Sequence, residues 1–138
     1  DQIQNPDTGQ KYKFPIRVAN QVISDPRAIK ETVDMMKMVT ERGGTAVTAD
    51  VPGYEVAGKT GTAQKWIDGA YSRTKYVASF IGFVPADNPA FVLLIAVDEP
   101  RGSIYGTRVA APSFATISKK TLRYLDIPPD YDLKAKAK

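Results

Sequence analysis

The stretch Val56-Ala57-Gly58-Lys59-Thr60-Gly61-Thr62-Ala63-Gln64 predicts a β-strand around which the rest of the chain is arranged. A glycine inside a strand often marks a place where another backbone or a ligand comes close, and this stretch holds two. Beside them stand the ammonium group of Lys59 and the hydroxyls of Thr60 and Thr62. Such groups suit the binding of an anion and a peptide backbone. The alternative is a glycine-punctuated edge strand with a solvated lysine.

The composition of the 138-residue chain is that of one ordinary globular domain, with 43% hydrophobic and 25% charged residues. The absence of cysteine and histidine excludes disulfides, thiolate chemistry, His-ligated zinc and a Ser-His-Asp triad. We therefore expect no metal and no other cofactor. The net charge of +4 owes much to the lysines of residues 134–138, so no nucleic-acid partner is predicted. Because the chain opens on Asp1 and not on methionine, we expect a piece of a longer protein or a processed product.

Residues 1–23 predict a hairpin or extended segment with a turn at Asn5-Pro6-Asp7-Thr8-Gly9. A strand of alternating polarity is expected from Tyr12 to Val18, confined to an edge by Pro15.

A helix is expected over residues 24–44, because Ser24-Asp25-Pro26 is typical of a helix start and Gly43-Gly44 of a helix end. Apolar residues recur between them at helical spacing. The methionines at positions 35, 36 and 38 are predicted to fill the core.

Three antiparallel strands are predicted within residues 54–98. A polar connection, residues 65–75, follows the Lys59 strand, and residues 76–84 form the second strand. The five-residue turn 85–89 is too short for a parallel crossover. The third strand, 91–97, is apolar at every position and should be covered on both faces. A final helix at 109–126 and a disordered tail at 130–138 complete an α+β fold.

Two literal motif matches are rejected on context. Residues 53–60 fit a phosphate loop and 93–99 an acidic magnesium strand, which makes a nucleotide hydrolase the rival interpretation. A phosphate loop must lead into a helix, whereas these residues favour a strand. Ser72 and Lys75 have serine-x-x-lysine spacing, but side chains three apart on extended chain point to opposite faces. Asp98 and Glu99 are not expected to share an acid–base site for a similar reason.

The chain resembles the C-terminal half of the transpeptidase domain of class B penicillin-binding proteins, in the β-lactamase-like superfamily. The Lys59-Thr60-Gly61 tripeptide is one motif of this superfamily. Further segments carry the resemblance in order along the chain: residues 44–46, 58–64, 79–86, 97–100, 105–106 and 109–112.

The resemblance implies an enzyme that cross-links peptidoglycan stem peptides through an acyl-serine intermediate and that β-lactams trap. Of the three family motifs, only lysine-threonine-glycine stands in the family's order here. No serine-x-asparagine occurs, and the single serine-x-x-lysine lies downstream of Lys59. The resemblance therefore implies that this chain alone is inactive. It also implies that the parent works in the bacterial periplasm or at the outer face of the membrane.

The resemblance also assigns residue roles. Lys59 and Thr60 would be catalytic, and Lys59, Thr60, Gly61 and Thr62 would bind substrate, with the Thr62 amide in the oxyanion hole. Gly61 would let the backbone approach the ligand. Gln64, Trp66 and Tyr71 would lie at the periphery.

In the family, the N-terminal half of the domain completes a five-stranded sheet. The 91–97 strand of this incomplete piece is therefore expected to have an unpaired edge. That edge predicts pairing with the N-terminal half or self-association. A non-catalytic interaction module of the same fold remains an alternative.

Overall fold

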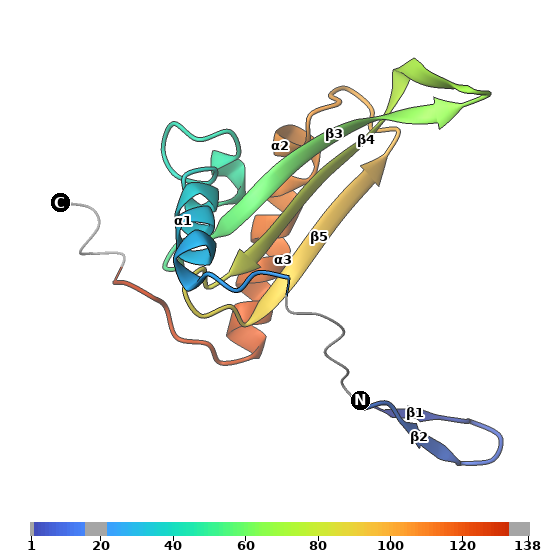
Figure 1. Ribbon diagram of the computed structural model, residues 1–138, viewed down its shortest axis with the longest axis vertical. Helices are drawn as coiled ribbons and strands as arrows, with labels where there is room; N and C mark the ends of the chain where they lie inside the picture. Colours follow the sequence, from blue (N-terminus) through green and yellow to red (C-terminus); the bar gives the residue numbers. More distant parts are fainter. Residues whose placement is uncertain (1, 16–21, 133–138) are drawn as a thin grey trace.

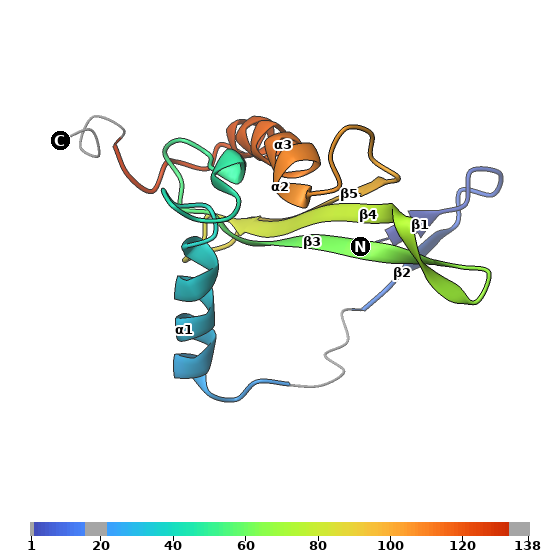
Figure 2. The ribbon, with the colours of Figure 1, turned by 90° about the horizontal axis from the view of Figure 1, so that it is seen from above.

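A three-stranded antiparallel sheet is the centre of the computed structural model, which describes residues 2–15 and 22–132 (Figure 1). Its strands, in spatial order, are β3 (Ala57–Ile67), β4 (Ala70–Val84) and β5 (Phe91–Asp98). Helices α2 (Gly106–Val109) and α3 (Ala111–Tyr124) cover one face, and α1 (Pro26–Lys37) lies on the opposite side (Figure 2). The expected α+β fold with an antiparallel sheet is confirmed.

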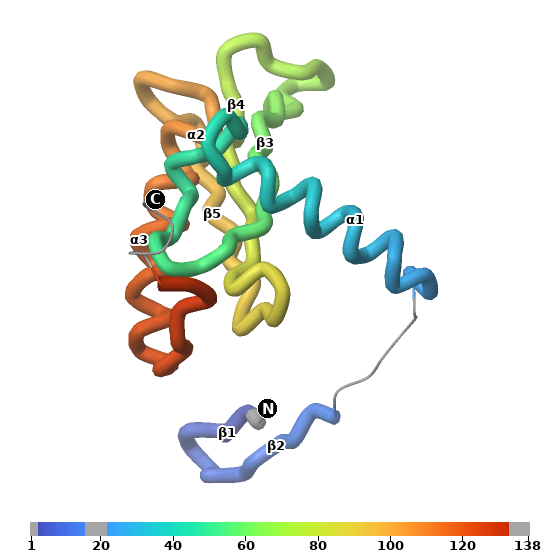
Figure 3. Tube along the Cα trace, turned by 90° about the vertical axis from the view of Figure 1, so that its left-hand side faces the viewer, coloured from blue at the N-terminus to red at the C-terminus, as the bar shows by residue number. Residues whose placement is uncertain are grey.

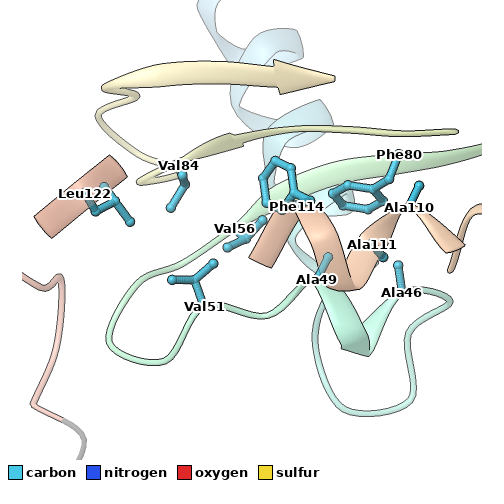
Figure 4. Packing of buried hydrophobic residues seen from close by; sticks show 10 residues of the cluster. All are labelled: Ala46, Ala49, Val51, Val56, Phe80, Val84, Ala110, Ala111, Phe114 and Leu122. Atoms are coloured by element: carbon cyan, nitrogen blue, oxygen red, sulfur yellow. The ribbon is translucent and has the colours of Figure 1, made fainter. Parts of the chain in front are cut away.

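The core lies between the sheet and α3 (Figure 4). Phe80 of β4 meets Phe114 of α3 edge to face, with ring centroids 4.8 Å apart. A Cβ at Gly82 would lie 2.9 Å from the Phe114 ring, so the glycine leaves the space that this ring fills. The other buried members of this cluster come from the 46–56 segment, β4, the α2–α3 junction and α3: Ala46, Ala49, Val51, Val56, Val84, Ala110, Ala111 and Leu122.

The predicted polar connection over residues 65–75 is wrong, because β3 and β4 continue into it as a hairpin arm. The strands meet at a two-residue turn, Asp68 and Gly69, with φ angles of 50° and 84°. Both angles are positive, as a type I′ hairpin turn requires, and Asp-Gly is a favoured pair for it. Trp66 and Tyr71 are thereby paired across the arm.

Helix α1 begins near the predicted start, where the Asp25 carboxylate accepts a hydrogen bond from the Arg27 amide at 2.9 Å. It ends at Lys37 instead of running to residue 44. After the helix the Thr40 hydroxyl donates to the Val56 carbonyl at 2.9 Å and ties the turn to the lead into β3. A short 3-10 helix, η1 (Val47–Ala49), follows. The glycine pair lies in the turn after the helix, where Gly43 has a φ of 92° and Gly44 packs against the Met38 carbonyl.

The methionine prediction is contradicted for two of the three side chains. Met35 and Met38 are 61% and 63% exposed, and no residue of α1 is buried. The helix contacts β3 near its C-terminal end and projects away from the sheet (Figure 3). Its apolar stripe faces no other described element, so the pattern identified an apolar face but not its cover.

Strand β5 is covered on one face only, contrary to the sequence prediction. Leu93 and Ile95 pack against the core, whereas Val92 and Leu94 are 65% and 56% exposed. Ile81 of β4 is exposed in the same cross-strand row as Leu94. Within the described residues the sheet thus has an open apolar face opposite α3.

The predicted final helix over 109–126 is observed as α3, and the short helix α2, which was not predicted, precedes it and meets it at Ala110. The segment after α3 packs against the lead to β3, where Tyr54 donates to the Ile127 carbonyl at 2.7 Å. Asp130 accepts a hydrogen bond from the Glu55 amide at 2.8 Å, so it is anchored. The remainder of the predicted tail, 133–138, lies outside the described residues.

The N-terminal segment forms a separate two-stranded sheet of β1 (Gln2–Gln4) and β2 (Lys11–Lys13). The Asn5 side chain accepts hydrogen bonds from the Asp7 and Thr8 amides and so shapes the turn. The strand predicted from Tyr12 to Val18 stops at Lys13, and its residues 16–18 lie outside the described part.

Candidate active site

Residues 59–62 lie in the middle of β3, which is an edge strand of the main sheet. Lys59 pairs with Ile81, and Gly61 with Ser79, in antiparallel register. A strand continues directly after Thr60, where a phosphate loop would require a helix. The nucleotide-hydrolase interpretation is therefore contradicted by the structure.

The hydrogen-bonding pattern decides which backbone groups of β3 are free. The Glu99 amide donates to the Tyr76 carbonyl at 2.9 Å, so Tyr76 turns its backbone groups toward β5. Because this direction alternates along a strand, Ser79 turns its own groups toward β3. Ser79 stands opposite Gly61, and the two residues therefore exchange backbone hydrogen bonds.

The orientation of the backbone groups of Thr60 and Thr62 follows from the same alternation. Their N–H and C=O groups point away from β4, to the edge of β3 that carries no strand in the described part of the chain. The ammonium of Lys59 donates to the Thr60 carbonyl at 2.9 Å. Among the described residues Lys59 makes no salt bridge, unlike Lys37 and Lys65. The edge thus combines outward amides with a cation that no carboxylate neutralises.

The side chains of Lys59 and Thr60 leave β3 on opposite faces. Lys59 shares a cross-strand row with Ile81 on the open apolar face, and Thr60 shares one with Phe80 on the α3 face. Lys59 and Thr62 are exposed. Charge, hydroxyl and amide therefore converge only at the strand edge, where they can hold an anion and polarise a carbonyl.

The two glycines of the motif have packing roles. A Cβ at Gly61 would lie 2.4 Å from the Ser79 hydroxyl, and one at Gly58 would lie 2.4 Å from the Phe80 ring. The sheet itself therefore requires Gly58 to lack a side chain, because the Phe80 ring is buried and the Ile81 carbonyl belongs to backbone. At Gly61 the neighbouring atom is a hydroxyl that can rotate away, so the packing demand there is weaker.

The peripheral residues lie farther along the hairpin arm. Gln64 pairs with Tyr76 where the arm begins. Trp66 and Tyr71 are exposed and contact each other edge to face, with ring centroids 4.8 Å apart. The structure brings these two aromatic residues together but places neither beside Lys59 in the register.

A brace that sequence reasoning missed fixes the arm to the end of β5. Lys65, at an irregularity in the β3–β4 register, lies 2.8 Å from Asp98 and 2.9 Å from Glu99. The hydrogen bond to Asp98 contributes most to raising the pKa of Lys65, and the bond to Glu99 contributes next. The hydrogen bond from Lys65 lowers the pKa of Glu99. The prediction that Asp98 and Glu99 share no acid–base site stays a prediction, but their side chains converge on Lys65 although alternation expected them to face opposite ways. They converge because Glu99 has a φ of 47°, which alternation did not anticipate.

Ser72 and Lys75 do not form a nucleophile–base pair. The Ser72 hydroxyl accepts hydrogen bonds from the Thr74 and Lys75 amides, at 3.2 and 3.0 Å. The Lys75 ammonium lies 3.4 Å from Glu99 instead. This geometry agrees with the sequence argument that Ser72 and Lys75 are not a functional serine-x-x-lysine motif.

A cavity of about 680 Å³ opens near the end of α1 and includes none of residues 59–62 in its lining. There Lys37 lies 2.6 Å from Asp87 and 2.8 Å from Glu55, and the bond to Asp87 contributes most to raising its pKa. A paired lysine of this kind is a structural link between α1 and the sheet.

The residues that the structure describes hold neither a candidate metal site nor a membrane-spanning helix. No group of three or more acidic side chains there could hold a metal ion. No helix there has the length and apolar character needed to cross a membrane.

Comparison with known proteins identifies the family. The model of the penicillin-binding protein transpeptidase domain matches residues 3–119. Probable peptidoglycan D,D-transpeptidase PenA of Neisseria gonorrhoeae is 43% identical over 109 residues, which cover 78% of this chain and 19% of the relative. Stage V sporulation protein D of Bacillus subtilis is 44% identical over 120 residues, covering 86% of this chain and 18% of the relative.

Solved structures agree with the family match. The TP domain of penicillin-binding protein 3 from Burkholderia pseudomallei is 42% identical, with a TM-score of 0.69 over 78% of this chain and 33% of that one. Penicillin-binding protein 3 from Mycobacterium tuberculosis, in complex with ampicillin, is 33% identical, with a TM-score of 0.77 over 95% of this chain and 31% of that one.

The chain belongs to the penicillin-binding protein transpeptidase domain family. It spans about a fifth of the length of the curated relatives that it matches.

Proposed function

We propose that this chain is the C-terminal part of one serine D,D-transpeptidase domain, which cross-links peptidoglycan stem peptides. The observation that carries the proposal is the free edge of β3, where outward amides of Thr60 and Thr62 adjoin the Lys59 ammonium, which no carboxylate of the described residues neutralises. An extended peptide with a terminal carboxylate is the ligand that such an edge suits, because strand addition satisfies the amides and the cation meets the carboxylate. The relatives named as D,D-transpeptidases support the same conclusion.

Each residue of the edge has a proposed role. Lys59 orients the substrate and tunes proton transfer, and the hydroxyls of Thr60 and Thr62 bind the terminal carboxylate. The outward Thr62 amide supplies one donor of the oxyanion hole, worth about 3 kcal/mol in transition-state stabilisation in comparable enzymes. Gln64, Trp66 and Tyr71 contact the substrate beyond this centre, along the hairpin arm.

The attacking serine comes from another part of the domain, because this sequence has no serine-x-asparagine and Ser72 is committed to backbone amides. The N-terminal half of the domain is thus the partner that we propose. It would cover the open apolar face around Ile81 and Leu94 and pair with the free edge of β5. Without it, the same edge would favour self-association. We place the working enzyme in the bacterial periplasm, where peptidoglycan is cross-linked.

Labelling with a fluorescent penicillin tests this function. We expect no covalent label on the separate chain and full label on the complete transpeptidase that contains it. Lys59→Ala in the complete protein should slow acylation about 10- to 100-fold, the effect of losing a charge-assisted hydrogen bond of 1.5–3 kcal/mol. Lys120→Ala, which removes an exposed lysine of α3, is the matched control and should leave the rate unchanged. Labelling of the separate chain, or equal rates for both variants, would contradict the proposal.

A further inference from the structure

The backbone at the start of α2 presses against the sheet directly behind the proposed substrate-binding edge. A Cβ at Gly106 would lie 2.0 Å from the Ser79 carbonyl oxygen and 3.0 Å from the Gly61 carbonyl oxygen. Both atoms belong to backbone, which cannot swing aside as a flexible side chain can. Gly106 is not among the residues with positive φ, so its lack of a side chain answers a steric demand and not a conformational one.

The atom that Gly106 approaches matters for the edge. The Ser79 carbonyl accepts the hydrogen bond of the Gly61 amide, as the alternation along β4 dictates. Gly61 is the residue between Thr60 and Thr62. Its hydrogen-bonded pairing with Ser79, called here the Gly61–Ser79 rung, fixes how far the free amides of Thr60 and Thr62 stand from the sheet. Any displacement of the Ser79 carbonyl therefore moves those outward groups.

Helix α2 has little freedom to retreat. The Thr48 hydroxyl donates to the Thr107 carbonyl at 2.7 Å and so ties α2 to the short helix η1. Ala110 and Ala111, which follow, are fully buried in the core. A side chain at position 106 would thus force a shift on the hydrogen-bonded Gly61–Ser79 rung as well as on α2.

We propose that Gly106 is a positioning residue for acyl transfer. Its bare backbone lets α2 support the Gly61–Ser79 rung and so sets the geometry of the Thr60 and Thr62 amides. This inference rests on the proposed function, because the edge must be the substrate site for its geometry to matter. Gly106 touches no substrate itself and acts through the rung.

The test compares two variants of the complete transpeptidase. Gly106→Ala should slow acylation by fluorescent penicillin by roughly ten- to a hundredfold, as misplacement of reacting groups does in other enzymes. Leu122→Ala, a cavity in the core at the other end of α3, lowers thermal stability but should leave the acylation rate of the folded protein unchanged. If Gly106→Ala folds and reacts at the unmodified rate, the inference is wrong.

A second measurement needs no variant. Amide hydrogen exchange of the unliganded protein should be slow at Gly61 and fast at Thr60 and Thr62. Fast exchange at Gly61 would overturn the inference even if Gly106→Ala does not fold. If the unmodified protein is not acylated at all, the proposed function is wrong. The exchange pattern still tests whether Gly61 is hydrogen-bonded to Ser79, independently of acylation.

Discussion

Ser118 lies on the buried side of α3 with no exposed surface, and its hydroxyl has no hydrogen-bond partner among the described residues. A buried hydroxyl without a partner costs about 1–3 kcal/mol in desolvation. Ser118→Ala should therefore raise the free energy of unfolding by about 1 kcal/mol. Urea unfolding of the complete protein measures this change.

Thr40 provides the contrasting control at the same scale. Its hydroxyl is buried as well, but it donates to the Val56 and Lys37 carbonyls. Thr40→Val keeps the shape and removes the donor, so it should lower the free energy of unfolding by about 1 kcal/mol. If both substitutions shift stability in the same direction, hydrogen bonding is not what distinguishes these two hydroxyls.

The hairpin arm depends on its two-residue turn. Gly69 has a φ of 84°, which an alanine adopts only with strain, so Gly69→Ala should destabilise the protein by about 1–2 kcal/mol. Gly69→Asn should cost less, because asparagine tolerates this region of backbone space. Thermal unfolding of both variants measures the difference, and equal losses would mean that backbone strain is not the cause.

The brace around Lys65 should make the stability of the arm depend on pH. Because the Glu99 pKa lies below its usual 4.5, the contribution of Glu99 exists above that value and is lost as pH falls through the lowered pKa. Because the Lys65 pKa lies above its usual 10.5, the contribution of Lys65 exists below that value and is lost as pH rises through the raised pKa.

The stability difference between the unmodified protein and Lys65→Met should accordingly be largest between these limits. It should shrink in acid as Glu99 becomes protonated and in strong base as Lys65 loses its proton. Melting temperatures across the pH range test this prediction, with Lys119→Met on exposed α3 as control. A difference that does not change with pH would show that Lys65 stabilises the arm by packing alone.

At the scale of the whole molecule, the open face of the sheet should behave differently in the separate chain and in the complete protein. Val92 and Leu94 expose apolar side chains there. Replacing both with lysine should reduce self-association of the separate chain, as seen by sedimentation velocity, because charges oppose sheet contacts. In the complete protein the same pair of substitutions should destabilise the fold, because the N-terminal half would bury those lysines. Opposite results would argue that this half covers another surface.

The sequence predicted features that depend on local chemistry and missed those that depend on distant contacts. The strand at Lys59, its antiparallel neighbours and the start of α1 follow from short-range patterns. The end of α1 was missed because the residues after Lys37 form a turn, which the Thr40–Val56 hydrogen bond joins to a segment 16 residues away. The exposure of Met35 was missed because helical spacing reveals an apolar face but not what covers it.

The candidate site shows the same division. The sequence identified the motif residues, but the direction of their backbone amides could be determined only from the register of β3 and β4. The Lys65 brace joins positions 33 residues apart and left no recognisable sequence pattern. The Asp68-Gly69 turn, by contrast, was a short-range signal that could have extended both predicted strands.

The outward amides of β3 have an evolutionary consequence under the proposed function. Mutation replaces side chains but leaves the peptide group intact. Only a substitution by proline would therefore remove the backbone N–H at position 62. An inhibitor and the natural peptide that share these contacts would depend on the same irreplaceable atoms. Variants that bind the natural peptide but not the inhibitor would therefore arise among the residues that support or orient β3, more readily than within the edge itself.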